Sequence, residues 1–218
     1  MDLTSYRTLG RSGLAVSPMS LGAMTFGREN WGADAAESKA IFDRYVDAGG
    51  NFIDTANVYA DGESERILGR FIHTRGVRDS IVLATKAGLA TGAHPNASGL
   101  GAKHVHAALD ASLQRLQTDY IDLFWLHLWD CRTPAEEIVR TMSGLVRSGK
   151  VRYWGVSNTP AWIVARIATL AAANGEPGPI GQQYEYSLLE RSVEIDFVPL
   201  AAEMGMGLVP GARWVPGS

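Results

Sequence analysis

Apolar residues are arranged along the chain in two ways: in short continuous runs, and in longer segments where they recur every three to four positions. Short apolar runs are typical of β-strands buried on both faces, and the longer segments are typical of amphipathic helices. We predict strands at 18–27, 51–56, 80–88, 120–127, 151–158, 179–186 and 206–210. We predict helices at 34–50, 63–76, 102–118, 134–150, 160–175 and 194–205. Ahead of them, 4–17 is predicted to form a β-hairpin around Arg11-Ser12-Gly13.

This alternation of strands and helices predicts an α/β protein with a parallel sheet covered by helices. Two arrangements fit, an open doubly wound sheet and a closed (β/α)8 barrel. The dinucleotide-binding form of the open sheet carries G-x-G-x-x-G after its first strand. The first strand here ends in SLGAMTFG, which lacks that pattern. We therefore discount a nucleotide fingerprint of that kind, and at this length we expect residues 1–218 to form one domain.

Composition and charge narrow the classes of partner. A formal net charge of −3 over 218 residues predicts no nucleic-acid or membrane partner. No apolar run approaches the roughly 20 residues of a membrane span, and the first residues lack the pattern of a signal peptide. Cys131 is the only cysteine, so an internal disulfide is excluded and a reducing compartment is favoured. We expect a cytoplasmic protein that acts on a small molecule.

Polar residues collect where the predicted strands end. In a barrel all carboxyl ends of the strands lie on one face, where barrel active sites are built. We therefore expect these side chains to converge on one pocket. They are Asp54 with Tyr59 in the following loop, Lys86, His127, Ser157 with Asn158, and Gln182 with Gln183.

The residue types in this set predict proton transfer to an oxygen. A phenol is a poor acid at neutral pH, but a neighbouring ammonium group stabilises the phenolate and lowers the pKa of the phenol. A carboxylate beside the lysine keeps it charged, and a histidine can bond the same substrate oxygen or relay a proton. Carbonyl reduction needs such a proton donor when a hydride source lies beside it.

The sequence closely resembles the aldo-keto reductases, NADP(H)-dependent enzymes on a TIM (β/α)8 barrel, in the stretches NFIDTANVYADGESERILG, LATK, TDYIDLFWLH, GKVRYWGVSN and QYEYSLLER. FDRYVDAGGNFIDTANVY and LHLWD resemble the bacterial members that are similar to voltage-gated potassium channel β subunits. The resemblance runs from about residue 6 to Pro210. It implies hydride transfer from NADP(H) to an aldehyde or ketone.

The resemblance also implies a role for each strand-end residue. Asp54, Tyr59, Lys86 and His127 match the catalytic tetrad of the family, with Tyr59 as the general acid. Ser157, Asn158 and Gln183 match the positions that hold the nicotinamide carboxamide. Trp31, Trp129 and the MTF segment at 24–26, which contains Phe26, lie in loops that would shape the substrate pocket. A place in the core or at the rim fits these aromatic residues equally well.

The chain departs from the family at its end. Family members run past 300 residues, whereas GARWVPGS follows the seventh strand here without a helical pattern. We expect an incomplete barrel without its eighth strand and last helices, through a frameshift or truncation near Pro210 or a vector-derived end. Because the family binds the pyrophosphate and 2′-phosphate with that part, weak cofactor binding and little turnover are expected. A second protomer or a swapped segment would close the gap, so a homo-oligomer stays open.

Other functions stay open beside the reductase. A regulatory barrel similar to channel β subunits, or an inactive remnant, would keep the fold with little chemistry. A third hypothesis is an enzyme that forms a Schiff base on Lys86. We rank it last because Asp54, Tyr59 and His127 have no evident role in it. We expect no metal site, since His73, His94, His104 and His106 lack partners at ligand spacing and are expected at the surface. Glu63 and Glu65 are expected as solvated acids in the first turn of a helix.

Overall fold

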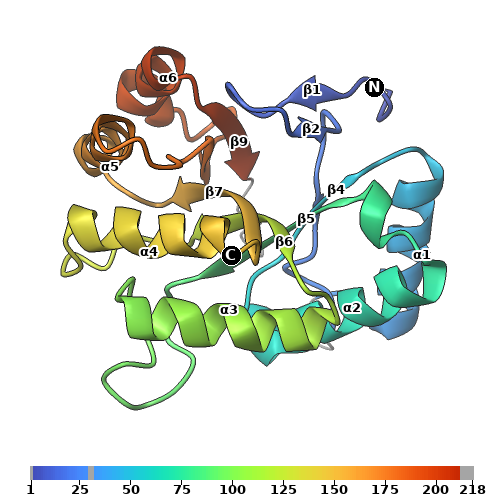
Figure 1. Ribbon diagram of the computed structural model, residues 1–218. Helices are drawn as coiled ribbons and strands as arrows, with labels where there is room; N and C mark the ends of the chain where they lie inside the picture. Colours follow the sequence, from blue (N-terminus) through green and yellow to red (C-terminus); the bar gives the residue numbers. More distant parts are fainter. Residues whose placement is uncertain (1, 29–31, 212–218) are drawn as a thin grey trace.

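A computed structural model describes residues 2–28 and 32–211. In this part of the chain, seven parallel strands form one curved sheet in chain order. The strands are β3 (Leu21–Gly22), β4 (Phe52–Asp54), β5 (Val82–Ala87), β6 (Ile121–Leu126), β7 (Val151–Ser157), β8 (Gly181–Glu185) and β9 (Gly207–Gly211). The helices are α1 (Ala35–Asp47), α2 (Glu63–Arg75), α3 (Ala102–Leu116), α4 (Ala135–Arg147), α5 (Ala161–Ala173) and α6 (Val193–Met204). Figure 1 shows the helices along the outer side of the sheet.

The predicted order of strands and helices is confirmed, but the first strand is much shorter than predicted. Of residues 18–27, only Leu21–Gly22 pairs with β4. The chain then turns away from the sheet, because the Phe26 N–H bonds the Ala23 carbonyl at 3.2 Å and Phe26 forms a bridge with Ala33. The described residues also contain two 3-10 turns, η1 (Tyr59–Gly62) and η2 (Arg78–Ser80).

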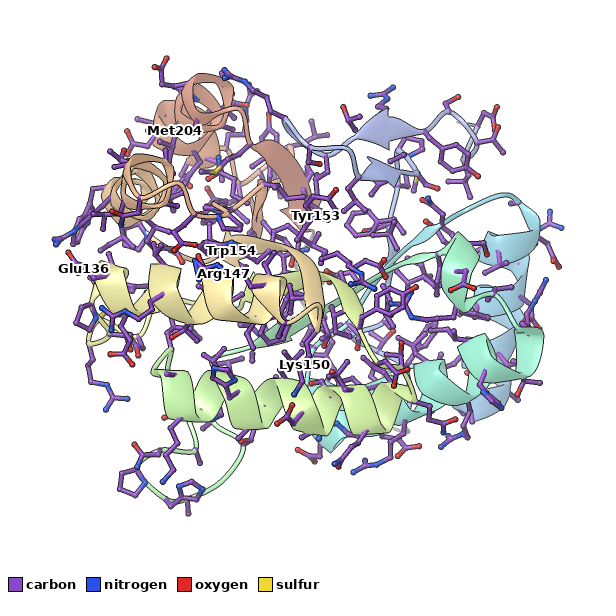
Figure 2. All side chains as sticks on the ribbon, viewed as in Figure 1. Glu136, Arg147, Lys150, Tyr153, Trp154 and Met204 are labelled. Atoms are coloured by element: carbon purple, nitrogen blue, oxygen red, sulfur yellow. The ribbon has the colours of Figure 1, made fainter. Side chains whose placement is uncertain are left out.

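Side chains of each strand alternate between two apolar layers. On β7, Trp154 packs in the outer layer between sheet and helices, and its neighbour Tyr153 packs in the inner cluster (Figure 2). Trp125 of β6 fills the inside of the sheet at the level of Gly155, where a Cβ would lie 2.3 Å from the Trp125 ring. The interior is therefore packed with side chains, as in a barrel core.

The predicted N-terminal hairpin is confirmed and covers the amino end of the strands. It consists of β1 (Arg7–Thr8) and β2 (Ala15–Val16), which pair antiparallel. Leu9 joins the inner cluster, and the Arg11 N–H bonds the carbonyl of Gly205, just before β9, at 2.7 Å. Figure 1 shows the hairpin beside β9. Since the hairpin occupies one end of the sheet, the carboxyl ends of the strands form the other, accessible end.

The curved sheet is an incomplete TIM-type barrel. In the described residues β3 and β9 are its two edge strands. A cavity of about 530 Å³ lies between β9 and the chain at 16–20. Among the described helices, none combines the length and the apolar character needed to cross a membrane.

Candidate active site

Asp54 and Lys86 meet inside the sheet because their strands are neighbours. Asp54 ends β4, and Lys86 lies near the end of β5, which pairs with β4 in parallel. The Lys86 ammonium donates hydrogen bonds to Asp54 Oδ1 and, at 2.9 Å, to the Thr55 carbonyl. It lies 3.3 Å from the Tyr59 hydroxyl. A buried lysine thus has a carboxylate, a carbonyl and a phenol around it.

The charge of Lys86 depends on these neighbouring polar groups. The side chain is 1% exposed, and burial by itself lowers the pKa of Lys86. The Asp54 carboxylate and the Tyr59 oxygen together outweigh burial, so the pKa of Lys86 lies above its ordinary value of 10.5. Lys86 is therefore a fixed positive charge at neutral pH, directed at the oxygen of Tyr59.

Tyr59 lies at the start of a strained turn. It begins η1, and the next three residues, Ala60, Asp61 and Gly62, have left-handed φ angles of 48°, 53° and 85°. Such angles are unfavourable for residues other than glycine and persist only where the surroundings enforce them. The turn lets the chain leave β4, present Tyr59 above Lys86 and enter α2 within a few residues.

His127 follows β6 and faces the Tyr59 ring edge-on, with 5.9 Å between ring centroids and 86° between ring planes. Burial, and secondly the charge of Lys86, lower the pKa of His127 from 6.5 to about 4. The imidazole is therefore neutral at neutral pH, and it can donate one hydrogen bond without carrying charge.

We expect the imidazole of His127 to stay neutral from pH 8 to about pH 5 and to titrate near pH 4, as followed by NMR of its ring protons. Since the folded state binds this proton more weakly than the unfolded chain, stability is complete above pH 6.5 and is lost as pH falls towards 4. The loss is about 3 kcal/mol by linkage. Lys86→Met should raise the midpoint, because it removes a positive charge. A midpoint near 6.5 in the unaltered protein would contradict this.

Ser157, Asn158 and Gln183 surround the same end of the sheet. Asn158 has a left-handed φ of 44°, and its amide donates to the His127 carbonyl and to Ser157 Oγ, each at 3.0 Å. The Gln183 amide reaches across the interior from β8 to Asp54 Oδ2 at 3.2 Å. The structure thus brings the seven predicted tetrad and carboxamide residues into one chain of contacts.

A pocket of about 360 Å³ opens at this end. Its lining is Ser20, Gly22, Met24, Thr25, Asp54, Tyr59, Gln183, Pro210 and Gly211. Met24 and Thr25 belong to the MTF segment that we expected to shape the substrate pocket. Thr55, whose carbonyl bonds Lys86, was missed, although its place directly after Asp54 was a usable signal.

Of the three aromatic candidates, Phe26 and Trp129 lie in or against the outer core, the alternative to a pocket wall. Phe26 is 2% exposed and packs in the outer core, because the turn after Ala23 directs it towards the helices. Trp129 packs against the outer core and stands edge-on to Trp162 of α5 at 5.3 Å. Trp31 lies outside the described residues.

Two polar residues expected at the surface are buried. His104 is 4% exposed on α3, and Glu65 is 0% exposed on α2. Glu65 lies three and seven positions before Leu68 and Ile72, so the spacing of apolar residues already placed it on the buried face of the helix. Among residues 2–28 and 32–211, no group of three or more His, Cys, Asp or Glu side chains is placed to hold a metal ion.

Known proteins similar to this chain share most of its length. A family model described as "Aldo/keto reductase family" matches residues 18–214. Norsolorinic acid reductase B of Aspergillus parasiticus is 42% identical over 219 residues, covering 95% of this chain and 57% of that protein. The aryl-alcohol dehydrogenase [NADP(+)] of Phanerodontia chrysosporium is 39% identical, covering 91% and 55%.

A probable voltage-gated potassium channel subunit beta of Oryza sativa is 41% identical, covering 97% of this chain and 63% of that protein. The chain thus spans a little over half the length of the curated relatives it matches. The expected likeness to both reductases and channel β subunits is confirmed. On the family match and these identities, the chain belongs to the aldo/keto reductase family.

Proposed function

We propose that the site reduces a carbonyl group to an alcohol with NADP(H) as the hydride donor. The observation that carries the proposal is the placement of the Lys86 ammonium between Asp54 and the Tyr59 hydroxyl at the accessible end of the sheet. The enzyme names of its relatives support the same chemistry.

In this proposal Tyr59 gives its hydroxyl proton to the carbonyl oxygen as negative charge develops there. Lys86 stabilises the negative charge left on the Tyr59 oxygen, and Asp54 holds Lys86 in place. Neutral His127 donates a hydrogen bond to the same substrate oxygen, which orients the carbonyl. The buried position of Lys86 strengthens its electrostatic effect, because little water screens it.

The residues present fit a nicotinamide carboxamide. Asn158 is exposed, Gln183 is half-buried in the pocket, and within the described residues nothing donates a hydrogen bond to Asn158 Oδ1 or Gln183 Oε1. These oxygens can accept from the carboxamide N–H groups, and the Ser157 hydroxyl can donate to its oxygen. A reduced nicotinamide held there would supply the hydride.

The substrate class that we propose is an aromatic aldehyde or ketone. Met24, Pro210 and Gly211 contribute apolar lining to the pocket that also contains Asp54 and Tyr59. Among the relatives, one name contains an aryl alcohol and NADP(+). An apolar wall beside a few polar groups suits a flat ring that carries one carbonyl group.

The test uses the 218-residue chain with NADPH, NADH and 4-nitrobenzaldehyde. Because the segment that the family uses for the phosphates is expected to be absent, we expect weak but saturable changes in NADPH fluorescence on titration. Once the aldehyde is added at near-saturating NADPH, we expect a slow fall in NADPH absorbance. Binding of neither nucleotide, or binding without reduction of any member of a broad panel of aldehydes and ketones, would overturn the proposal.

The second of these outcomes would support another function, a regulatory barrel protein that binds NADP(H) without appreciable turnover. The similarity to the rice potassium channel β subunit favours this candidate. We rank it second because the buried contacts of Lys86 with Asp54 and Tyr59 have a role in proton transfer, whereas a regulatory barrel does not require them.

A further inference from the structure

The buried carboxylate of Glu65 lies directly behind the active site, outside the set of groups that would touch substrate. It is on the first turn of α2, three residues after Gly62, where the turn that begins at Tyr59 ends. One carboxylate oxygen accepts from the Thr85 hydroxyl at 2.6 Å, and the other accepts from Arg115 Nε at 2.6 Å. A buried charge satisfied on both oxygens holds its partners to one geometry.

The two partners of Glu65 come from different parts of the fold. Thr85 is the residue before Lys86 on β5, and its side chain points to the helix side of the sheet while Lys86 points inward. Arg115 is the second-last residue of α3. Glu65 thus connects the strand that carries Lys86 with the helix that lies against α2.

Arg115 also contacts the Tyr59 turn. Gly62 is buried, and a Cβ built on it would lie 2.9 Å from Arg115 Cδ. The arginine side chain therefore packs closely against the backbone of Gly62, the last residue of the left-handed turn. Ser112 Oγ accepts a second hydrogen bond from the Arg115 guanidinium at 3.3 Å, so the side chain is fixed at two points.

The neighbouring helix residue makes a parallel connection. The Ser64 hydroxyl bonds Thr55 Oγ1 and the Ala23 carbonyl, each at 2.8 Å. Thr55 follows Asp54, and its carbonyl accepts from Lys86. The first turn of α2 is therefore joined to β4 through Ser64 and to β5 through Glu65. The left-handed turn lies directly before these two residues, and Arg115 packs against its last residue, Gly62.

We infer that Glu65 and Arg115 are positioning residues for Tyr59. Glu65 orients Arg115, and Arg115 holds the strained turn in the left-handed conformation that keeps the Tyr59 hydroxyl beside Lys86. The inference rests on the proposed function only for its catalytic consequence. Its structural content, an ordered turn enforced by the buried pair, is measurable without cofactor or substrate.

The test measures hydrogen exchange at the amides of Tyr59, Asp61 and Glu63. Each is hydrogen-bonded within the turn, to Ala56, to Val58 and to the Tyr59 and Ala60 carbonyls respectively. In Arg115→Gln we expect exchange at these amides to be at least tenfold faster. Arg115→Lys keeps the charge beside Glu65 and methylene groups beside Gly62, and should restore most of the protection.

The matched control is Arg70→Gln, the same change in an exposed Arg–Glu pair within α2, the helix that carries Glu65. It should alter exchange in the turn by less than twofold. Because Arg115→Gln leaves a buried carboxylate unpaired and can fail to fold, the double variant Glu65→Gln/Arg115→Gln is measured as well. The double variant removes both charges, and we expect it to fold. Its turn amides should still exchange at least tenfold faster than those of the unaltered protein.

Exchange in the double variant within twofold of the unaltered protein would overturn the inference. Equally faster amide exchange throughout α2 and α3 would also overturn it, because the pair would then only join the two helices. Measuring turnover distinguishes the positioning role from the proposed reductase function. If the protein is a reductase and the pair positions Tyr59, kcat for 4-nitrobenzaldehyde should fall about tenfold in the double variant, with KM unchanged within twofold. A freed turn in a protein without any reductase activity would uphold the positioning role and reject the reductase. A freed turn with unchanged kcat would reject the catalytic consequence of the positioning role.

Discussion

Replacing Tyr59 by phenylalanine should lower kcat for reduction of an aromatic aldehyde by about 10²–10⁴-fold, the usual contribution of a positioned acid. The substitution removes only the hydroxyl that lies 3.3 Å from Lys86 and keeps the ring that packs against His127. Since the hydroxyl acts in the transition state, KM for the aldehyde and affinity for NADPH should change little. Initial rates at saturating NADPH measure the effect.

The matched control for this prediction is Tyr153→Phe. Tyr153 also points into the interior of the sheet, but it packs in the inner cluster near the N-terminal hairpin (Figure 2). Removing the Tyr153 hydroxyl should leave kcat within about twofold of the value for the unaltered protein. If Tyr59→Phe keeps more than a tenth of the unaltered rate, Tyr59 is not the proton donor, and the rates of His127→Gln would decide whether the imidazole takes that role.

The order of strands and helices was predictable because both signals are local. Parallel strands covered by helices are apolar on both faces, and β5 and β6 show this plainly, with almost every residue buried. The helices carry one apolar stripe each. The extent of β3 was not predictable, because residues 24–27 turn away from the sheet and Phe26 pairs with Ala33. No short stretch of sequence specifies that contact.

The meeting of Asp54 with Lys86 was also predictable from the strand order. Neighbouring parallel strands end on the same side, and both residues point inward. The contact from Gln183 to Asp54 spans 129 residues and depends on how strongly the sheet curves, so strand order alone does not give it. The burial of Glu65 was readable from the spacing in α2, but its partners Thr85 and Arg115 required the packing of α2 on α3.

The second large effect is on stability, and it concerns the pair beneath Tyr59. Asp54→Asn leaves the Lys86 ammonium buried without a carboxylate, and we expect it to lower the free energy of unfolding at pH 7 by about 3–5 kcal/mol. Adding Lys86→Met removes the remaining charge and should recover most of that loss. Urea unfolding of the two single variants and the double variant gives the coupling energy of the pair.

An exposed ion pair provides the comparison. Lys150, labelled in Figure 2, lies 2.8 Å from Asp110, and both side chains are about half exposed. Asp110→Asn should cost at most about 1 kcal/mol, because water solvates the freed ammonium. If Asp54→Asn also lowers the free energy of unfolding by at most about 1 kcal/mol, Lys86 either loses its proton or reaches water when the carboxylate is removed.

The pH dependence separates these two explanations. In the unaltered protein the pKa of Lys86 is raised, so its stabilising contribution is present below about pH 10 and is lost only as pH rises through the folded-state pKa. In Asp54→Asn burial acts without the carboxylate and lowers the pKa of Lys86 below that of the unfolded chain. The folded variant then disfavours the proton, and its stability should rise as pH increases from 7 to about 10, where the unaltered protein shows no such gain. A flat profile in the variant would place Lys86 in contact with water.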